Sequence, residues 1–442
     1  SGVVLTTGQQ PGLFGGPIYT WAKAVSAIAC ADVLEELTGV PVVPVFWAAT
    51  DDSDFLEASW TIVASGGRVT RLALPNKPPD GTRLADVPLE DTGELLEALA
   101  QACGSSADRR AMELVARSYV PGTTFGSAYV KLLRGLLEPM GMVVLDAANP
   151  EVSRAADSIL RRALEQHGAV SSALMERDRE IRAAGYTPQV AFDPARTLVF
   201  EVQGGRRRRI AAASVEDALR NLPPGTLSPN VLLRPVVERW LLPTAAYAAG
   251  PGELAYFAQA SAVARALGLA LPVALPRWST TLVEPEVAKI LEKYGLEVSD
   301  LAHRTQVETR LAKAAWPSSL TESLARLRHA VADGVADVAE QVSIHGLLAG
   351  TAAAEALERW MLWRIDRFER RVNAAVKKRE EQLMHDIAVA AASLFPAGIR
   401  QERALNIVPL LARFGLEVLA HMRREAEHHA HATLVPGSVA VA

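Results

Sequence analysis

Apolar runs of strand length and one long helical pattern alternate through the first fifty residues. Residues 3–5 form a short apolar run, and residues 41–50 are almost wholly apolar, which is typical of a strand buried on both faces of a parallel sheet. Between these runs, apolar positions from Ile18 to Leu37 keep helical spacing, and Gly39 stands where a C-terminal cap belongs. The order strand, helix, strand predicts a βαβ unit of an α/β fold.

A glycine-rich segment, TTGQQPGLFGGP at residues 6–17, links the first strand to this helix. Glycines let a backbone approach a ligand closely, and the free N–H groups of a following helix favour an anion. The segment matches neither the G-x-G-x-x-G nor the P-loop motif, and a tight turn is the alternative interpretation. Lys23, about two turns into the helix, can reach the segment with its long side chain. The candidate cofactor-binding residues are Gly8, Gln9, Gln10, Gly12, Gly15, Gly16 and Lys23.

Three aspartates, Asp51, Asp52 and Asp54, follow the second apolar run. If the two strands are parallel, this cluster and the glycine-rich segment lie at the same edge of the sheet, where open α/β sheets bind ligands. Asp52 and Asp54 are therefore the candidate catalytic residues. The alternative interpretation is a solvated turn with an N-cap aspartate.

Four segments in a fixed order carry a resemblance to a known family: TGQQPGLFGGPIYT, PVFWAATDDSDF, residues 230–284 and LFPAGIRQERALNIVPLLARFG. Over residues 7–419 the chain resembles the cysteine ligase family of bacillithiol biosynthesis, BshC. The resemblance implies a Rossmann-like parallel-sheet core, similar to that of class I aminoacyl-tRNA synthetases, with an inserted α+β region and an antiparallel helical coiled-coil hairpin. It also implies an enzyme that joins L-cysteine to glucosaminyl-malate through an amide bond.

A second glycine-containing turn lies within the third of these segments, where Gly250 precedes Pro251 and a helix. Glu253 falls in the first turn of this helix, where a carboxylate either favours the helix dipole or, as the resemblance favours, binds a substrate. Aromatic residues at helical spacing are usually core, but those near Glu253 can also line one pocket. The candidate substrate-binding residues are Arg234, Tyr247, Gly250, Glu253, Tyr256, Gln259 and Arg277.

Amide formation sets further expectations, because a carboxylate anion is a poor electrophile and must first be activated. The expected cofactor is ATP, with Mg²⁺ as a candidate second cofactor. Gln9 and Gln10 can donate to phosphate, Lys23 and the two candidate arginines can bind phosphate or malate carboxylates, and Asp52 and Asp54 can hold an amine or a metal. Whether ATP yields ADP or AMP stays open.

Two positions depart from the pattern of the family. Its acidic motif usually reads E-D-H-D, and Ser53 stands at the histidine position, which removes the side chain best suited to proton transfer near neutral pH. Glu238 and Arg239 stand where the family usually has Gln-Asp. Two alternatives to the ligase therefore stay open: a non-catalytic, ligand-binding paralogue, and a related ligase with a different acyl acceptor.

Changes in pattern divide the chain into five segments. We expect residues 1–75 and 230–315 to supply the two halves of the core and residues 76–229 to form the inserted region. Residues 316–395 should form the helical hairpin, and residues 396–442 should pack back on the core. Within the inserted region, a GG hairpin signal precedes four arginines at 206–209. A solvated edge strand is favoured over a phosphate site for these arginines.

The helical hairpin is predicted by apolar positions spaced three and four residues apart in 318–342 and 361–375. Flanking alanines, together with Trp360 and Trp363, leave apolar surface that a second copy can cover. The expected assembly is therefore a homodimer through residues 318–395. The alternative is that the hairpin docks on its own core.

Composition excludes several classes of function. A net charge of −4 gives no electrostatic case for nucleic acid, and two cysteines fit a reducing compartment rather than a disulfide scaffold. No apolar run reaches the roughly 18–20 residues that span a bilayer, and no leader opens the sequence, so we expect a cytoplasmic protein with no membrane partner. The histidines near residues 428–431 are interpreted as a solvated helix end rather than a zinc site, and no metal-ligating residue is assigned.

Overall fold

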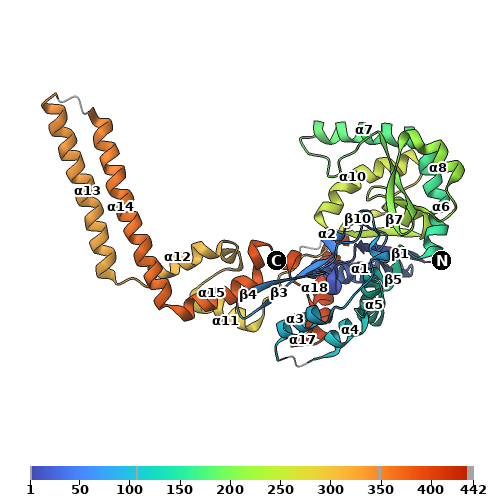
Figure 1. The fold of residues 1–442 in the computed structure, drawn as a ribbon, viewed down its shortest axis with the longest axis horizontal. Coiled ribbons are helices and arrows are strands. Elements are labelled where there is room, and N and C mark those ends of the chain that lie inside the picture. Colours follow the sequence, from blue (N-terminus) through green and yellow to red (C-terminus); the bar gives the residue numbers. More distant parts are fainter. Residues whose placement is uncertain (1, 106–107, 347–349, 436–442) are drawn as a thin grey trace. The chain divides into compact units, whose positions relative to one another are not determined.

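The structure is a computed structural model that describes residues 2–105, 108–346 and 350–435. It contains two compact units (Figure 1). The first unit comprises Ser1–Val63, Thr70–Thr281 and Gln401–Ala442, and the second comprises Ala64–Val69 and Leu282–Arg400. The five segments predicted from the sequence are a finer division than these units and stay a prediction.

A five-stranded parallel sheet forms the centre of the first unit, in the order β10-β9-β1-β2-β5. The chain runs from β1 outward to β2 and β5, and then returns to the other side of β1 for β9 and β10. The topological switch point therefore lies between β1 and β9, and doubly wound sheets bind ligands at the carboxyl ends of such strands. The predicted α/β fold is confirmed. The strands are β1 (Val3–Gln9), β2 (Val42–Ala48), β5 (Val143–Asp146), β9 (Thr244–Ala249) and β10 (Val273–Pro276).

Two long helices cover this sheet. Helix α1 (Ile18–Thr38) packs on β1 and β2 and is itself covered by α18 (Glu417–Leu434), whereas α10 (Pro251–Ala266) packs on β9, β10 and α7 (His167–Ala183). Because the direction of the crossovers reverses at β1, right-handed connections place α1 and α10 on opposite faces of the sheet. Gly39 ends α1 in the left-handed conformation, as its position predicts.

A three-stranded antiparallel sheet, in the order β7-β6-β8, forms part of the inserted region. Its strands are β6 (Arg196–Gln203), β7 (Arg206–Ala211) and β8 (Leu227–Pro229). Gly204 and Gly205 both have positive φ in the hairpin turn between β6 and β7, which confirms the predicted hairpin.

Further helices complete the first unit. The helices are α2 (Phe55–Ala58), α3 (Gly93–Cys103), α4 (Arg110–Ser118), α5 (Phe125–Leu137), α6 (Pro150–Glu165), α8 (Val215–Asn221), α9 (Arg234–Leu241), α16 (Gln401–Ala404) and α17 (Val408–Phe414). A two-stranded sheet joins β3 (Trp60–Ser65) to β4 (Arg68–Ala73).

The second unit is helical. Helices α13 (Ser318–Ile344) and α14 (Gly350–Arg379) run side by side (Figure 1) and are accompanied by α11 (Pro285–Tyr294), α12 (Arg304–Ala314) and α15 (Glu381–Leu394). Trp316 donates a hydrogen bond to Asn373, and Arg328 pairs with Asp366. Trp316, just before α13, thus meets a later residue of α14 than Arg328 does, so the two helices are antiparallel. The predicted hairpin is therefore confirmed.

The hairpin differs from its prediction in two details. Its buried seam contains Leu324, Val331 and Val335, whereas Leu327 and Val338, which the spacing also assigned to the seam, are about half exposed. The segment predicted as the hairpin, residues 316–395, also contains a break, because α14 ends at Arg379 and α15 begins at Glu381.

The glycine-rich segment is a packed turn. A Cβ on Gly12 would lie 2.7 Å from the Cα of Gly16. The N–H groups of Gly15 and Gly16 donate to the carbonyls of Gly12 and Leu13 within the turn. The side chain of Asn406 donates to the carbonyls of Leu13, Phe14 and Gly16, at distances of 3.0 to 3.3 Å. At the start of the following helix, the N–H groups of Ile18 and Thr20 donate to the carbonyls of Leu405 and Pro17, so these two of the N–H groups that the sequence offered to an anion already have partners.

Substituting Gly15 by alanine should destabilise the first unit by about 2–4 kcal/mol, as measured by urea denaturation. Its φ is +91°, and an added Cβ would lie 2.7 Å from the ring of buried Trp21. Gly39→Ala is the matched control, because φ there is +68° but no atom lies within 4 Å of the added Cβ. The control should cost only about 1–2 kcal/mol. Equal losses in the two variants would contradict a packing role for Gly15.

Candidate functional site

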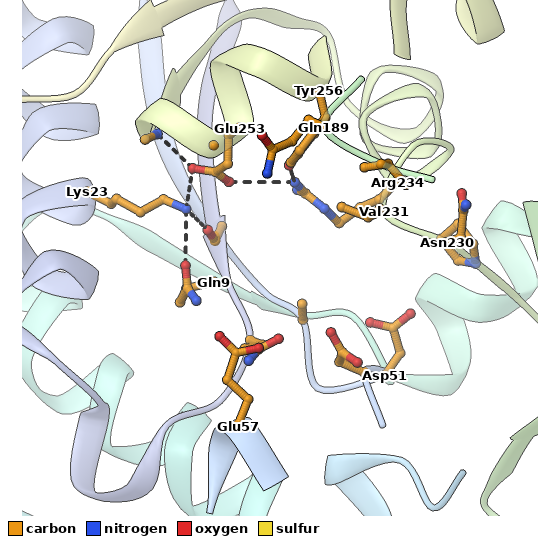
Figure 2. A pocket seen from close by; sticks show the side chains of 18 of the residues that line it. Gln9, Lys23, Asp51, Glu57, Gln189, Asn230, Val231, Arg234, Glu253 and Tyr256 are labelled. Atoms are coloured by element: carbon orange, nitrogen blue, oxygen red, sulfur yellow. Dashed lines mark hydrogen bonds and ion pairs between the residues drawn. The ribbon is translucent and has the colours of Figure 1, made fainter. Parts of the chain in front are cut away.

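A cleft of about 640 Å³ opens at the carboxyl ends of the parallel strands, beside the switch point (Figure 2). Its walls come from the ends of β1 and β2, from β6 and β7, and from the start of α10, all within the first unit. This volume is typical of small-molecule sites. The predicted residues that line it are Gly8, Gln9, Gln10, Lys23, Asp52, Arg234, Gly250, Glu253, Tyr256 and Arg277.

An ion pair between Lys23 and Glu253 spans the switch point (Figure 2). The Lys23 Nζ lies 2.7 Å from Glu253 Oε2 and also donates to the carbonyl of Gly8 and, at 3.3 Å, to Gln9 Oε1. The other side of the pair is fixed by the N–H of Gly250, which donates to Glu253 Oε2 at 2.8 Å. The pair therefore ties the end of β1 to the start of α10.

Burial and charge act in opposite directions on this pair. Burial lowers the pKa of Lys23, and the charge of Glu253 opposes that shift. Burial alone would raise the pKa of Glu253, but the charges of Lys23 and Arg234 and the N–H of Gly250 outweigh it and hold that pKa below its usual value. The carboxylate of Glu253 is thus ionised at neutral pH and occupies the N-terminus of α10, where an anionic ligand would otherwise bind.

A second ion pair adjoins the first, because Arg234 Nη2 also lies 3.8 Å from Glu253 Oε1. Arg234 pairs with Glu238, which is fully buried, and donates to the hydroxyl of Tyr256 at 2.6 Å. Tyr247 donates to Glu253 Oε1 at 2.7 Å and accepts from Arg234 at 3.2 Å. Burial raises the pKa of Glu238, and Arg234 opposes that shift. The glutamate that departs from the family pattern is therefore the buried counter-ion of Arg234.

A third ion pair joins Arg277, at the end of β10, to Glu402 of α16. The guanidinium donates twice to the carboxylate, each time at 2.9 Å, and both side chains are buried. Lys23, Arg234 and Arg277 thus each have a carboxylate partner. The sequence predicts that these three cations bind phosphate or carboxylate groups; all three line the cleft, and their binding of a ligand stays a prediction.

The remaining predicted residues lie outside the cleft lining. Asp54 accepts a hydrogen bond from the N–H of Glu57 at 3.1 Å and caps α2, which is the alternative weighed for the acidic cluster. Tyr247 is buried below the cleft, and Gln259 bonds to Asp178 and to both backbone groups of Val190. Gly12, Gly15 and Gly16 belong to the packed turn. We assign these residues supporting roles.

Two carboxylates of the acidic cluster face the cleft. Asp51 accepts a hydrogen bond from the hydroxyl of Ser228 at 2.7 Å. Asp52 accepts from the N–H groups of Ser53 and Asp54 at 2.6 and 3.2 Å. Burial is the main cause of the raised pKa of Asp52; the charge of Arg207 opposes this shift, and the charge of Asp51 adds to it. Asp52 is therefore the cleft carboxylate best suited to accept a proton.

Two arginines that the sequence assigned to a solvated strand also line the cleft. Successive side chains alternate along β7, so Arg207 and Arg209 line the cleft, whereas Arg206 and Arg208 are exposed. The solvated interpretation is therefore wrong for two of the four arginines. The two-residue period of a strand was the signal that could have separated them.

Tyr19 and Arg403 also line the cleft and were not predicted as site residues, although both lie in the four motif segments. Tyr19 accepts a hydrogen bond from the side chain of Gln9 at 3.1 Å, and the guanidinium of Arg403 lies 6.0 Å from its ring. Burial is the first cause that raises the pKa of Tyr19 to about 12, with the charge of Glu57 second. The phenol therefore stays protonated at neutral pH. Asn230, in a third motif, also lines the cleft.

Neither a metal cluster nor a membrane span is evident in the ranges that the structure describes. No three His, Cys, Asp or Glu side chains there are grouped to hold a metal ion. Among these same residues, every helix is too short or too polar to cross a bilayer.

Comparisons with known proteins agree with this architecture. The family model for the N-terminal Rossmann-like domain of bacillithiol biosynthesis BshC matches residues 1–278, and that for its C-terminal coiled-coil domain matches residues 280–435. Relatives named "Putative cysteine ligase BshC" include one from Solibacter usitatus, 32% identical over 95% of this chain and 82% of the relative. Another, from Koribacter versatilis, is 33% identical over 94% of this chain and 80% of the relative. The chain therefore belongs to the BshC family of bacillithiol biosynthesis, with both of its domains.

Proposed function

We propose that this protein joins L-cysteine to glucosaminyl-malate by an amide bond in the last step of bacillithiol biosynthesis, with ATP activating the cysteine carboxylate. The observation that carries the proposal is the cleft at the switch point, which gathers residues from all four motif segments around one cavity. The names of the relatives support cysteine ligation. We place the reaction in the cytoplasm, where thiols stay reduced.

The residues of the cleft suit the steps that amide formation requires. Asp52 can accept the proton that the attacking amine loses, because its raised pKa brings it nearer to that of the amine. Gln9, Gln10 and Arg403 line the cleft and would hold ATP, and Asp51 and Glu57 are cleft carboxylates that could contact a Mg²⁺ ion brought in with ATP. When bound, ATP would supply the leaving group that a carboxylate lacks. The hydrogen-bonded side chains that line the cleft would hold both substrates in the orientation that the reaction needs.

The direct test is mass spectrometry of a reaction that contains purified protein, cysteine, glucosaminyl-malate and ATP. We expect the coupled thiol to accumulate together with one consumed nucleotide per product. Failure of both, beside an active homologue as a control, would favour the ligand-binding paralogue. Product from a different amine, but not from glucosaminyl-malate, would favour the related ligase with another acceptor.

We also propose that the protein forms a homodimer through the helical hairpin. Trp360, Trp363 and Phe368 on α14 are 58%, 45% and 51% exposed, and covering apolar surface gains about 25 cal/mol per Å². Light scattering should give about twice the 47.4 kDa of one chain, and Trp360→Glu with Trp363→Glu should give a monomer. Trp240→Glu, on α9, is the matched control and should stay dimeric. A wild-type protein that scatters as a monomer would contradict the proposal.

A further inference from the structure

Arg207 has an unsatisfied donor at the cleft. Only 7% of its side chain is exposed, and its Nε has no hydrogen-bond partner among the residues that the structure describes. Its Nη2 donates to the carbonyl of Pro229 at 2.6 Å, and its Nη1 lies 3.7 Å from Asp52 Oδ1. A buried donor without a partner is costly, so this guanidinium is arranged for a group that enters the cleft.

Arg209 lies beside it on the same face of β7. Both guanidinium groups stack on the ring of Phe200, at 4.2 Å for Arg207 and 5.0 Å for Arg209. Arg209 forms no ion pair with any carboxylate in the described parts of the chain, in contrast to Lys23 and Arg277. Two guanidinium groups held by one aromatic ring match two carboxylates on a short carbon chain, because each guanidinium can bind a carboxylate with two parallel hydrogen bonds.

We infer that Arg207 and Arg209 bind the two carboxylates of the malyl group of the acceptor, while Asp52 holds its amine. The inference rests on the proposed function. In a glucosaminyl-malate, the amine and the malyl group are on neighbouring ring carbons. The protein carboxylate that binds the amine must therefore lie close to the arginines that bind the malyl group. Asp52 meets this requirement, because its Oδ1 lies 3.7 Å from Nη1 of Arg207. A nucleotide has phosphates but no cationic amine, and it matches this neighbouring pair of charges less well.

The test compares Arg209→Gln with Arg208→Gln, since Arg208 is exposed and pairs with Glu201 on the same strand. In steady-state kinetics, Arg209→Gln should raise the KM for glucosaminyl-malate by about tenfold or more and leave the KM for ATP unchanged. A methyl glucosaminide, which lacks both carboxylates, should react equally with wild type and variant. Arg208→Gln should behave as wild type with both acceptors.

Calorimetric titration of glucosaminyl-malate without ATP or cysteine separates this inference from the proposed function. Wild type and Arg208→Gln should bind it, and Arg209→Gln should bind at least tenfold more weakly, even if no product is ever formed. Circular dichroism of Arg209→Gln controls for folding, and Arg207→Lys gives a second variant that keeps the charge but loses the two-pronged geometry. An unchanged affinity in Arg209→Gln, absence of binding by the wild type, or a raised KM for ATP alone would overturn the inference.

Discussion

Replacing Asp52 by asparagine should lower kcat by at least about 100-fold, as expected for the loss of a general base, while the melting temperature stays nearly unchanged. Asparagine keeps the size of the side chain and an oxygen for the N–H groups of Ser53 and Asp54, but it cannot accept a proton from the amine. The measurement is the rate of coupled product at saturating substrates, together with a thermal melt.

Asp54 provides the matched comparison. Its carboxylate caps α2 and does not line the main cleft, so Asp54→Ala should cost about 0.5–2 kcal/mol of stability and leave most of the turnover intact. The wild-type pH profile gives an independent check. Because burial raises the pKa of Asp52, this carboxylate becomes protonated at a pH above the ordinary aspartate pKa near 4. As the pH is lowered, kcat/KM should therefore begin to fall before the pH reaches about 4. Turnover that survives Asp52→Asn, or a melting temperature that collapses with it, would contradict the assignment.

Replacing Lys23 by methionine should lower the free energy of unfolding of the first unit by about 3–5 kcal/mol, because it leaves a largely buried carboxylate without its nearest counter-ion. Lys23 holds Glu253 at 2.7 Å, and among the described residues the cation that would remain paired with it is Arg234, at 3.8 Å. Urea denaturation is the measurement. The double variant Lys23→Met with Glu253→Gln should recover part of the loss, since both charges are then removed together.

An exposed pair in the same unit is the control for this prediction. Arg179 and Glu176 on α7 are 71% and 56% exposed, so Arg179→Met should cost less than about 1 kcal/mol. If Lys23→Met costs no more than Arg179→Met, or if the double variant is less stable than either single variant, then the pair does not stabilise the sheet edge in the way described.

The sequence was sufficient for the elements whose pattern is local. The buried run at 41–50 predicts β2, the helical spacing after residue 17 predicts α1, and the heptad-like spacing predicts α13 and α14. The roles of the charged residues in the site were harder to predict from the sequence, because the role of a charge depends on partners that are distant in the chain. Lys23 is compensated by Glu253 and Arg277 by Glu402, and no local pattern connects these residues.

Two other differences have local causes that the sequence contained. Arg234 and Glu238 are four residues apart on one helix, a spacing that places them on the same face. The glycine-rich segment is ambiguous in the sequence for a different reason, since close packing of a turn and close approach of a ligand both require glycine. The contacts of Trp21 and Asn406 with the segment show that it is a closely packed turn, and these contacts are known only from the structure.

The contacts between the first helix and the segment from Gln401 onward have a consequence for synthesis on the ribosome. Asn406 holds the turn before α1, Leu405 accepts from the N–H of Ile18, and α18 covers the outer side of α1. Domains generally begin to fold as they emerge from the ribosome, but here the first βαβ unit emerges long before the segment that covers it. A nascent chain that has only reached the helical hairpin exposes the apolar surface of α1, and this intermediate is where chaperone binding and aggregation should be concentrated.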